Sequence, residues 1–248
     1  MAVAIAGGVC LTLASLVIAE TGHAMCVNYT PPQPKQLVEY FEADNAIEHD
    51  WPQEAWQDYQ APILVAVEQQ RRVLVGNYGM IPRRRMPDGV RYSTMNARAE
   101  TLGETRSYRQ PWLRGQLCLV PMTGFFEPCY ESGKAERWQI GMASDEPFAV
   151  AGLLRAWREP DEGVSYSFTQ ITINADAHPL MRRMHKPGDE KRSLVIVPER
   201  EYDAWLQCKD PELARSFLTL YPTEAMIAKP MPLPGRPKSA AAQNQPLF

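Results

Sequence analysis

The sequence has few of the residues from which metal sites and disulfide frameworks are built. It contains four histidines and five cysteines, an odd number, and no Cys-x-x-Cys pair. Zinc sites require clustered ligands at short spacings, and disulfide-stapled domains require paired cysteines. We therefore expect no metal site and no cofactor, and a reducing, cytoplasmic location.

The first 24 residues lack the basic start of a secretory signal, because the first Lys or Arg of the chain is Lys35. The apolar run from Val9 to Ala19 is short for a membrane span, so no membrane association is expected. Three interpretations stay open: a signal peptide, a start codon assigned too early with Met25 as the true initiator, or a precursor segment that is removed. In each case, residues 1–24 are an extension outside the working fold.

Positive charge is not in excess overall, but it is concentrated in one region. The net charge is −3, whereas residues 71–115 carry ten arginines against three acidic residues, a local balance of +7. A basic region on an acidic protein is the pattern expected for phosphate contacts. The alternative is a solvated surface with scattered arginines.

Short β-branched runs predict many strands and few helices in the 200 or so residues after the extension. We expect a single compact α+β domain over residues 25–228, with flanking helices around a curved, largely antiparallel, barrel-like sheet. The proline-rich residues 229–248 are expected to be a disordered tail. The expected strands are Ile63–Val67, Val73–Gly76, Gln116–Val120, Arg137–Met142, Phe148–Leu154, Phe168–Ile173 and Ser193–Val197, and the expected helices are Pro34–Ala43, Glu199–Leu206 and Pro211–Leu220.

Four motifs follow one another along the chain: Met25-Cys26, Asn96-Ala97-Arg98-Ala99-Glu100-Thr101, Gly124-Phe125-Phe126-Glu127, and Met184-His185-Lys186-Pro187-Gly188-Asp189-Glu190-Lys191. Together they resemble the SRAP family, the abasic-site processing proteins that crosslink themselves to damaged single-stranded DNA. The resemblance runs from Met25 to about Val197. It implies a monomeric, nucleoid-associated, lyase-like enzyme of DNA repair whose partner is single-stranded DNA with abasic sites, without an obligate protein partner.

The resemblance gives Cys26 a chemical reason to become the N-terminal residue. An α-amine has a pKa of about 8, so part of it is neutral at physiological pH and can form an imine with the aldehyde of a ring-opened abasic site. The thiol can then close on the imine carbon to give a five-membered thiazolidine. An internal cysteine cannot do this, because its nitrogen is part of a peptide bond.

Three further catalytic residues are implied by the resemblance. The amide of Asn96 would hold Cys26 and the sugar by hydrogen bonds. Glu127 follows two phenylalanines, and these apolar surroundings are expected to raise its carboxyl pKa so that it can shuttle protons. His185 would protonate the opening sugar oxygen or support strand release. His178 is expected to be a bystander.

The resemblance also implies a DNA groove, in which Tyr78 and Met80 stack against bases and arginines contact phosphates. The sequence departs from the family pattern at several places: Tyr78 and Met80 replace Trp and Leu, Pro128 replaces Trp, and Asn28 replaces an arginine. Asn28 is thus expected to be a weaker phosphate contact. The residues expected to bind DNA are Asn28, Tyr78, Met80, Arg83, Arg84, Arg85, Arg98, Asn174 and Lys186.

Two other functions remain possible on the sequence. One is a cysteine peptidase that uses Cys26, His185 and Asn96 on itself or on other proteins. The other is a module that binds single-stranded DNA without chemistry. Covalent attachment to an abasic oligonucleotide would distinguish the crosslinking activity from both of these alternatives.

Overall fold

A tight hairpin starts the main sheet of the computed structural model, which describes residues 28–43 and 50–233. Its strands are β2 (Gln60–Val67) and β3 (Gln70–Tyr78). The turn residues Glu68 and Gln69 have φ values of 51° and 65°. A two-residue turn with positive φ at both positions matches the twist of the strands that it joins. The extension 1–24, Cys26 and the tail from residue 234 onward lie outside the described residues.

Five strands close into a barrel. β5 (Leu117–Met122) pairs with β2, β8 (Phe148–Arg158) pairs with β5, and β9 (Val164–Asn174) pairs with both β8 and β3. The β3–β9 pairing is parallel, and the other pairings of the ring are antiparallel. The expected barrel-like, largely antiparallel sheet is therefore confirmed.

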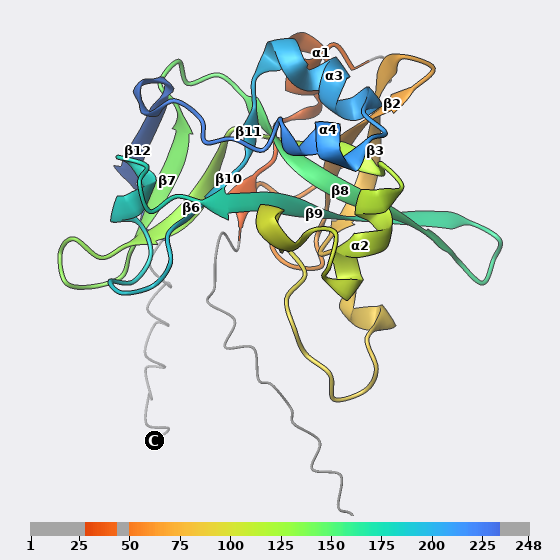
Figure 1. Cartoon of the computed structure of the whole chain (residues 1–248), viewed down its shortest axis with the longest axis horizontal. Coiled ribbons are helices and arrows are strands. Elements are labelled where there is room, and N and C mark those ends of the chain that lie inside the picture. The colour runs from red at the N-terminus through yellow and green to blue at the C-terminus, as the bar shows by residue number, and fades with distance from the viewer. Residues whose placement is uncertain (1–27, 44–49, 234–248) are drawn as a thin grey trace, which may run out of the picture.

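A second, four-stranded antiparallel sheet lies beside the barrel. Figure 1 shows it on the side away from the tip of the β8–β9 hairpin. It consists of β1 (Tyr29–Thr30), β6 (Gly124–Cys129), β7 (Glu136–Met142) and β12 (Met226–Pro230). Because β12 pairs with β7 through Pro230, and the Met231 N–H donates to the Arg137 carbonyl, the domain boundary expected at residue 228 is wrong.

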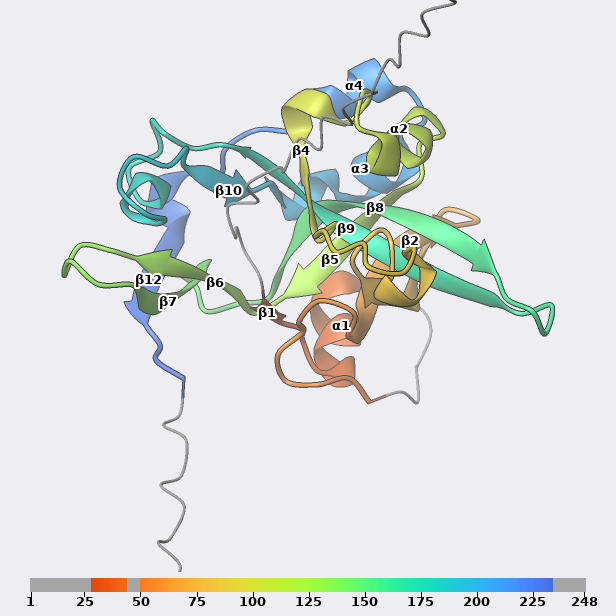
Figure 2. The same ribbon diagram turned by 90° about the horizontal axis from the view of Figure 1, so that it is seen from below.

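Helices and short strands cover the barrel. Figure 1 shows α1, α3 and α4 at one end of the barrel, and Figure 2 shows α1 on the opposite side of the strands from α2, α3 and α4. α2 contacts β8. α4 ends at Arg215, earlier than expected, whereas α2 was not expected. The helices are α1 (Pro34–Phe41), α2 (Arg106–Leu113), α3 (Tyr202–Gln207) and α4 (Pro211–Arg215). The short strands are β4 (Asn96–Arg98), β10 (Arg192–Leu194) and β11 (Ile196–Val197), and the 3-10 turns are η1 (Arg83–Arg85), η2 (Ala99–Thr101), η3 (Met181–Arg183), η4 (Glu199–Glu201) and η5 (Thr223–Ala225).

The strands bury both of their faces. Along β2, Ile63 and Val65 belong to one hydrophobic cluster, and Leu64 between them belongs to another that includes residues of α1, α2 and α3. This follows from the period of two in a strand, which sends successive side chains to opposite faces. Within the described residues, no helix is long and apolar enough to span a membrane.

Candidate active site

Glu127 lies inside a buried strand, β6, which is not among the strands expected from the sequence. Its side chain is 2% exposed, and Phe125 and Phe126 beside it are buried. Gly124 begins the strand, and a Cβ there would lie 2.8 Å from Gln139 Nε2, so a larger residue would require the Gln139 side chain to shift. The strand thus carries a carboxyl group into a nearly dry environment.

His185 lies directly against Glu127. Its Nδ1 is 3.5 Å from Glu127 Oε2, and its ring is 5% exposed. Two backbone features fix this position: the His185 N–H donates to the Pro128 carbonyl at 2.7 Å, and φ of His185 is 63°, in the left-handed region. A non-glycine residue in that region is held there by its surroundings. The structure therefore brings together two of the four expected catalytic residues.

The hydrogen bond made by His185 Nε2 determines whether Nδ1, the nitrogen that faces Glu127, carries a proton. Nε2 lies 3.2 Å from the Arg192 carbonyl oxygen, which can only accept a hydrogen bond. Nε2 must therefore carry the ring proton when the imidazole is neutral, and Nδ1 then presents a lone pair to Glu127. When His185 is protonated, Nδ1 presents an N–H instead. The two side chains can thus pass one proton between them.

An ion pair anchors the turn that precedes His185. Arg183 of η3 donates from Nε and Nη2 to the two carboxylate oxygens of Glu131, each at 2.8 Å. Glu131 belongs to the hairpin loop between β6 and β7, so the bridge ties that hairpin to η3. The hydrogen bonds from Arg183 lower the pKa of Glu131. The Arg183 guanidinium also lies 5.3 Å from the centroid of the Trp138 ring.

Asn96 lies on β4, which pairs in parallel with β9 opposite Gln170. Its carbonyl accepts a hydrogen bond from the Tyr108 hydroxyl at 2.9 Å. Arg98 follows opposite Thr172 on the same strand pair. The motif that contains both residues therefore begins as a strand laid along β9 and continues as the 3-10 turn η2.

Arg192 connects the second and fourth motifs and was missed on the sequence. Its buried guanidinium donates to Glu100 at 2.9 and 2.8 Å, to Glu190 at 2.8 Å and to the Thr172 carbonyl at 2.8 Å. Burial by itself raises the pKa of Glu100 and of Glu190, but the hydrogen bonds from Arg192 outweigh it and hold both carboxyl pKa values below their usual range. In the sequence, the position of Arg192 at the start of the apolar run that follows Lys191 could have indicated that this arginine is buried.

Glu190 also reaches two of the residues expected to bind DNA. Its Oε2 lies 2.7 Å from Arg98 Nη1, and its Oε1 accepts from Asn174 Nδ2 at 3.3 Å. Arg98 and Asn174 are exposed, as is Lys186, which is the other expected contact in this region. Two of the expected DNA contacts, Arg98 and Asn174, therefore lie close to Arg192, but with the carboxylate of Glu190 among them.

The arginines of η1 are likewise paired with acidic residues from other parts of the chain. Arg84 and Arg85 each lie 2.7 Å from Glu159 Oε1, and Arg83 Nε lies 3.2 Å from Asp58 Oδ2. The hydrogen bond from Arg84 is the largest of several contacts that lower the pKa of Glu159 to about 2. The local balance of +7 thus overstates the positive charge of this surface.

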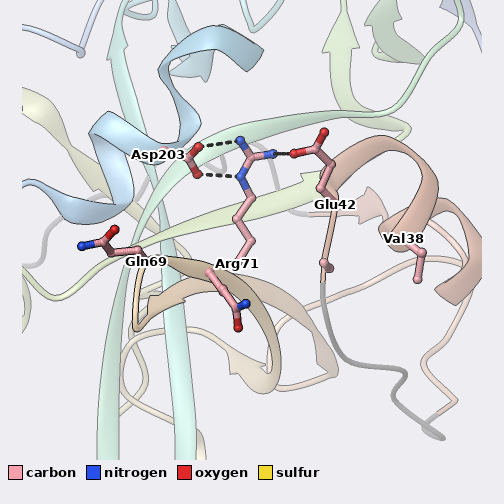
Figure 3. Close-up of a pocket in the computed structure, with 7 residues that line it drawn as sticks. Val38, Glu42, Gln69, Arg71 and Asp203 are labelled. Atoms are coloured by element: carbon pink, nitrogen blue, oxygen red, sulfur yellow. Dashed lines mark hydrogen bonds and ion pairs between the residues drawn. The ribbon is translucent and has the colours of Figure 1, made fainter.

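Arg71 is neutralised in the same way, inside a pocket of about 440 Å³ between α1, β3 and α3. Figure 3 shows its guanidinium between Asp203, at 2.7 Å, and Glu42, at 3.6 Å. The hydrogen bond from Arg71 lowers the pKa of Asp203. The pocket takes no lining residue from β4, β6 or the segment around His185, so it is separate from the Glu127–His185 pair.

Three residues expected to contact DNA are buried, which corrects that expectation. Tyr78 and Met80 are both 0% exposed, and Asn28 is 2% exposed. Tyr78 stacks on Phe168 and donates its hydroxyl hydrogen to Gln170 Oε1 at 2.9 Å, while Asn28 Nδ2 donates to Glu54 at 2.7 Å. These side chains are satisfied inside the domain and offer no surface for stacking on bases.

His178 is a structural residue. It is buried, its Nε2 lies 2.9 Å from the Tyr221 carbonyl oxygen, and its Nδ1 accepts from the Met181 N–H. Across residues 28–43 and 50–233, no group of three or more His, Cys, Asp or Glu side chains is arranged to hold a metal ion.

The comparisons with known proteins agree with the motifs. Residues 25–232 match the family model described as SOS response associated peptidase (SRAP), and the chain belongs to this family. It is 32% identical over 154 residues to the abasic site processing protein YoqW of Bacillus subtilis, an alignment that covers 61% of this chain and 65% of that protein. It is 24% identical over 200 residues to the abasic site processing protein HMCES of Xenopus tropicalis, covering 69% of this chain and 58% of that protein.

The fold is also similar to solved structures. A crystal structure of a protein from Bordetella bronchiseptica has a TM-score of 0.74 and 30% identity, and the alignment covers 84% of this chain and 100% of that one. A protein from Bacteroides thetaiotaomicron has a TM-score of 0.67 at 22% identity, with 83% of this chain and 92% of that chain covered, which shows likeness of fold alone. The chain matches less than two thirds of the length of the curated relatives named above.

Proposed function

We propose that this protein processes abasic sites in single-stranded DNA by joining Cys26, as an N-terminal residue, to the opened sugar through a thiazolidine. The observation that carries the proposal is the buried Glu127–His185 pair, with 3.5 Å between Oε2 and Nδ1. A buried carboxyl group beside an imidazole is an arrangement that can supply and take up the protons of imine formation. Membership of the SRAP family and the names of its relatives support the broader role, the processing of abasic sites.

The position of Asn28, the first described residue, supports Cys26 as the nucleophile. The Phe126 N–H donates to the Asn28 carbonyl at 3.2 Å, so the chain two residues after Cys26 lies beside the neighbour of Glu127. Two residues span at most about 7 Å. The α-amine and thiol of Cys26 can therefore meet an aldehyde near Glu127 and His185.

The reaction consumes one aldehyde and releases one water. The neutral α-amine adds to the aldehyde carbon, and the resulting hydroxyl leaves as water once it is protonated, which gives an imine. The thiol sulfur then adds to the imine carbon, and its proton ends on the nitrogen. Glu127 and His185 supply and take up these protons, and His185 protonates the sugar oxygen as the ring opens.

The test uses protein that begins at Cys26 and an oligonucleotide with one abasic site, separated on a denaturing gel. We expect a covalent band for the wild type, none for Cys26→Ala, and for Cys26→Ser a transient imine that borohydride traps. A wild-type yield of stable adduct with Cys26→Ala would overturn the proposal. A salt-sensitive gel shift without a covalent band would instead indicate binding without chemistry.

A second candidate activity is cleavage of the chain ahead of Cys26. The observation that favours it is His185 beside a carboxylate, because a cysteine nucleophile needs a base that a third group orients. We infer that Glu127, rather than Asn96, would act with His185, and that it would relay the proton of the thiol, because the second ring nitrogen of His185 is already bonded to the Arg192 carbonyl. If the extension is removed by this chemistry, a chain with Cys26→Ala keeps residues 1–25, as intact mass would show.

A further inference from the structure

Glu54 ties Asn28 to the hairpin that carries Glu127. One of its carboxylate oxygens, Oε2, accepts hydrogen bonds from Asn28 Nδ2 and from Arg137 Nη2, each at 2.7 Å. Asn28 is 2% exposed, and the side chains of Arg137 and Glu54 are 16% and 29% exposed. Hydrogen bonds to a charged group are strong at this length, and partial burial reduces their screening by salt. The three side chains therefore form a firm link, called here the Glu54 clamp.

Backbone hydrogen bonds hold the same segment from two sides. On one side, the Phe126 N–H of β6 donates to the Asn28 carbonyl at 3.2 Å. On the other side, Tyr29 and Ala55 exchange backbone hydrogen bonds at 3.3 and 2.8 Å. Because Glu54 immediately precedes Ala55, the side-chain contact and the backbone contacts come from one short segment. Asn28 therefore cannot shift along β6 without breaking contacts on both sides.

The Glu54 clamp lies behind the candidate active site and not inside it. Glu127 is in register with Trp138 across β6 and β7, so the preceding residues, Phe126 and Arg137, point to the opposite face of the sheet. The Arg137 guanidinium lies over that face, 3.3 Å from the centroid of the Phe126 ring. Glu54 is bonded to this guanidinium. The clamp can thus influence the reaction by placing the chain, without touching the reacting atoms.

The placement of Asn28 limits where the nucleophile can be. Two residues span at most about 7 Å, so a fixed Asn28 confines the α-amine of Cys26 to a small volume beside the β6 strand. Holding two reacting groups in the right geometry makes their encounter effectively intramolecular, and a displacement of about 1 Å can cost about 10²-fold in rate. A clamp two residues from the nucleophile is therefore placed to control the rate.

We propose that Glu54 is a positioning residue, which holds Asn28 so that the amine and thiol of Cys26 meet the aldehyde in a fixed orientation. The inference rests on the proposed function, because it takes Cys26 as the nucleophile. It adds a residue that lies in none of the four motifs. Glu54 comes 26 residues after Asn28 and 83 residues before Arg137.

The experiment measures single-turnover crosslinking of protein that begins at Cys26, over a range of concentrations of an oligonucleotide with one abasic site. Glu54→Ala should lower the rate constant at saturating DNA about tenfold and leave the half-saturating DNA concentration unchanged, because the clamp orients the nucleophile. Asn28→Ala should also lower the rate constant, and the double variant should be little slower than Glu54→Ala alone. Glu54→Gln keeps an oxygen that accepts from Asn28 and should recover part of the rate.

Amide hydrogen exchange tests the clamp without reference to the reaction. In Glu54→Ala, the Phe126 N–H should exchange faster than in the wild type, because its acceptor is the carbonyl of the loosened Asn28. The Ala151 N–H, which donates to the Val195 carbonyl at 2.8 Å in the barrel, should exchange as in the wild type. Faster exchange at both amides would indicate a general loss of stability and would overturn the positioning role.

Asp203→Ala is the matched control, because it removes the carboxylate partner of another largely buried arginine, Arg71, and should leave the crosslinking rate unchanged. An equal loss of rate in this control, or a wild-type rate in Glu54→Ala, overturns the positioning role. In either case a covalent band from the wild type leaves the proposed function in place. A wild type without that band overturns the proposed function, and with it the positioning of Cys26.

Discussion

His185 faces Glu127 with one ring nitrogen and the Arg192 carbonyl with the other, at 3.5 and 3.2 Å. The carbonyl fixes which nitrogen carries the proton of the neutral ring, so Nδ1 is free to exchange a proton with the carboxyl group. Burial of both side chains keeps bulk water from competing for that exchange. Glu127 and His185 are therefore expected to act together, so that substituting either residue should slow the reaction to a similar degree.

We expect Glu127→Gln and His185→Ala each to slow crosslinking by about 10²–10⁴-fold, the usual contribution of a general acid or base. The double variant should be little slower than either single one, because the two groups share one proton. Single-turnover gels give the rates, and anisotropy with undamaged DNA gives the affinity. If affinity fell as far as the rate, the residue concerned would belong to binding instead.

The extension should block the reaction, because residues 1–25 convert the Cys26 amine into an amide that cannot condense with an aldehyde. Intact-mass measurement of active protein should show a chain that begins at Cys26. A protein that still carries Met1 and crosslinks at the wild-type rate would contradict the role of the α-amine.

Tyr78→Phe tests whether this residue is part of the core or a wedge between bases. The change removes one buried hydroxyl, which donates to Gln170. We expect a loss of about 1 kcal/mol in the free energy of unfolding and no change in DNA affinity or crosslinking. Denaturant melts and anisotropy check the two parts separately. A large fall in DNA affinity at unchanged stability would indicate that Tyr78 does insert between bases.

Glu190→Gln should raise the affinity for undamaged single-stranded DNA severalfold, because it removes a negative charge 2.7 Å from the Arg98 guanidinium. Arg98→Gln should lower the affinity and reduce the salt slope by about 0.7. Glu199→Gln on η4 is the matched control for charge. An affinity of Glu190→Gln below that of the wild type would mean that Glu190 positions Arg98 and does not compete for it.

The cluster around Arg192 should make stability sensitive to acid. The pKa values of Glu100 and Glu190 lie below their usual value of 4.5 in the folded protein. Carboxylates whose pKa is lowered by folding stabilise the fold at pH values above their pKa in the unfolded chain. This stabilisation is lost as the pH falls through their pKa in the folded protein. The melting temperature of the wild type should therefore fall below pH 4.5, and that of Glu100→Gln should fall less. Equal slopes in the two proteins would remove Glu100 from the acid response.

The barrel could be predicted from the sequence where local pattern and final environment coincide. Ile63–Val67 and Val73–Gly76 are β-branched runs, and they form the β2–β3 hairpin. β6 was missed because Gly124, Glu127 and Pro128 are all poor strand residues. α2 was missed because it is largely polar and contains Pro111. In both elements, tertiary packing overrides local preference.

The site was predictable in its chemistry and less so in its electrostatics. Glu127 and His185 were expected from motifs and lie in contact. The pairing of the arginines was not foreseeable, because the partners are remote in sequence: Glu159 lies 75 residues after Arg84, and Asp203 lies 132 residues after Arg71. A charge count over a window of sequence cannot include carboxylates that the fold brings in from elsewhere.

The parallel contacts of β9 set the order in which the protein can become reactive during synthesis. β4 pairs with β9 and, in the described part of the chain, with no other strand, so Asn96 has no strand partner until Gln170 has left the ribosome. Glu127 likewise waits for His185. Pairings between distant segments form late, because loop closure must come first. A nascent chain therefore exposes its N-terminus long before the site is assembled. Under the proposed function, unfinished protein therefore lacks the Glu127–His185 pair that would assist its reaction with an aldehyde.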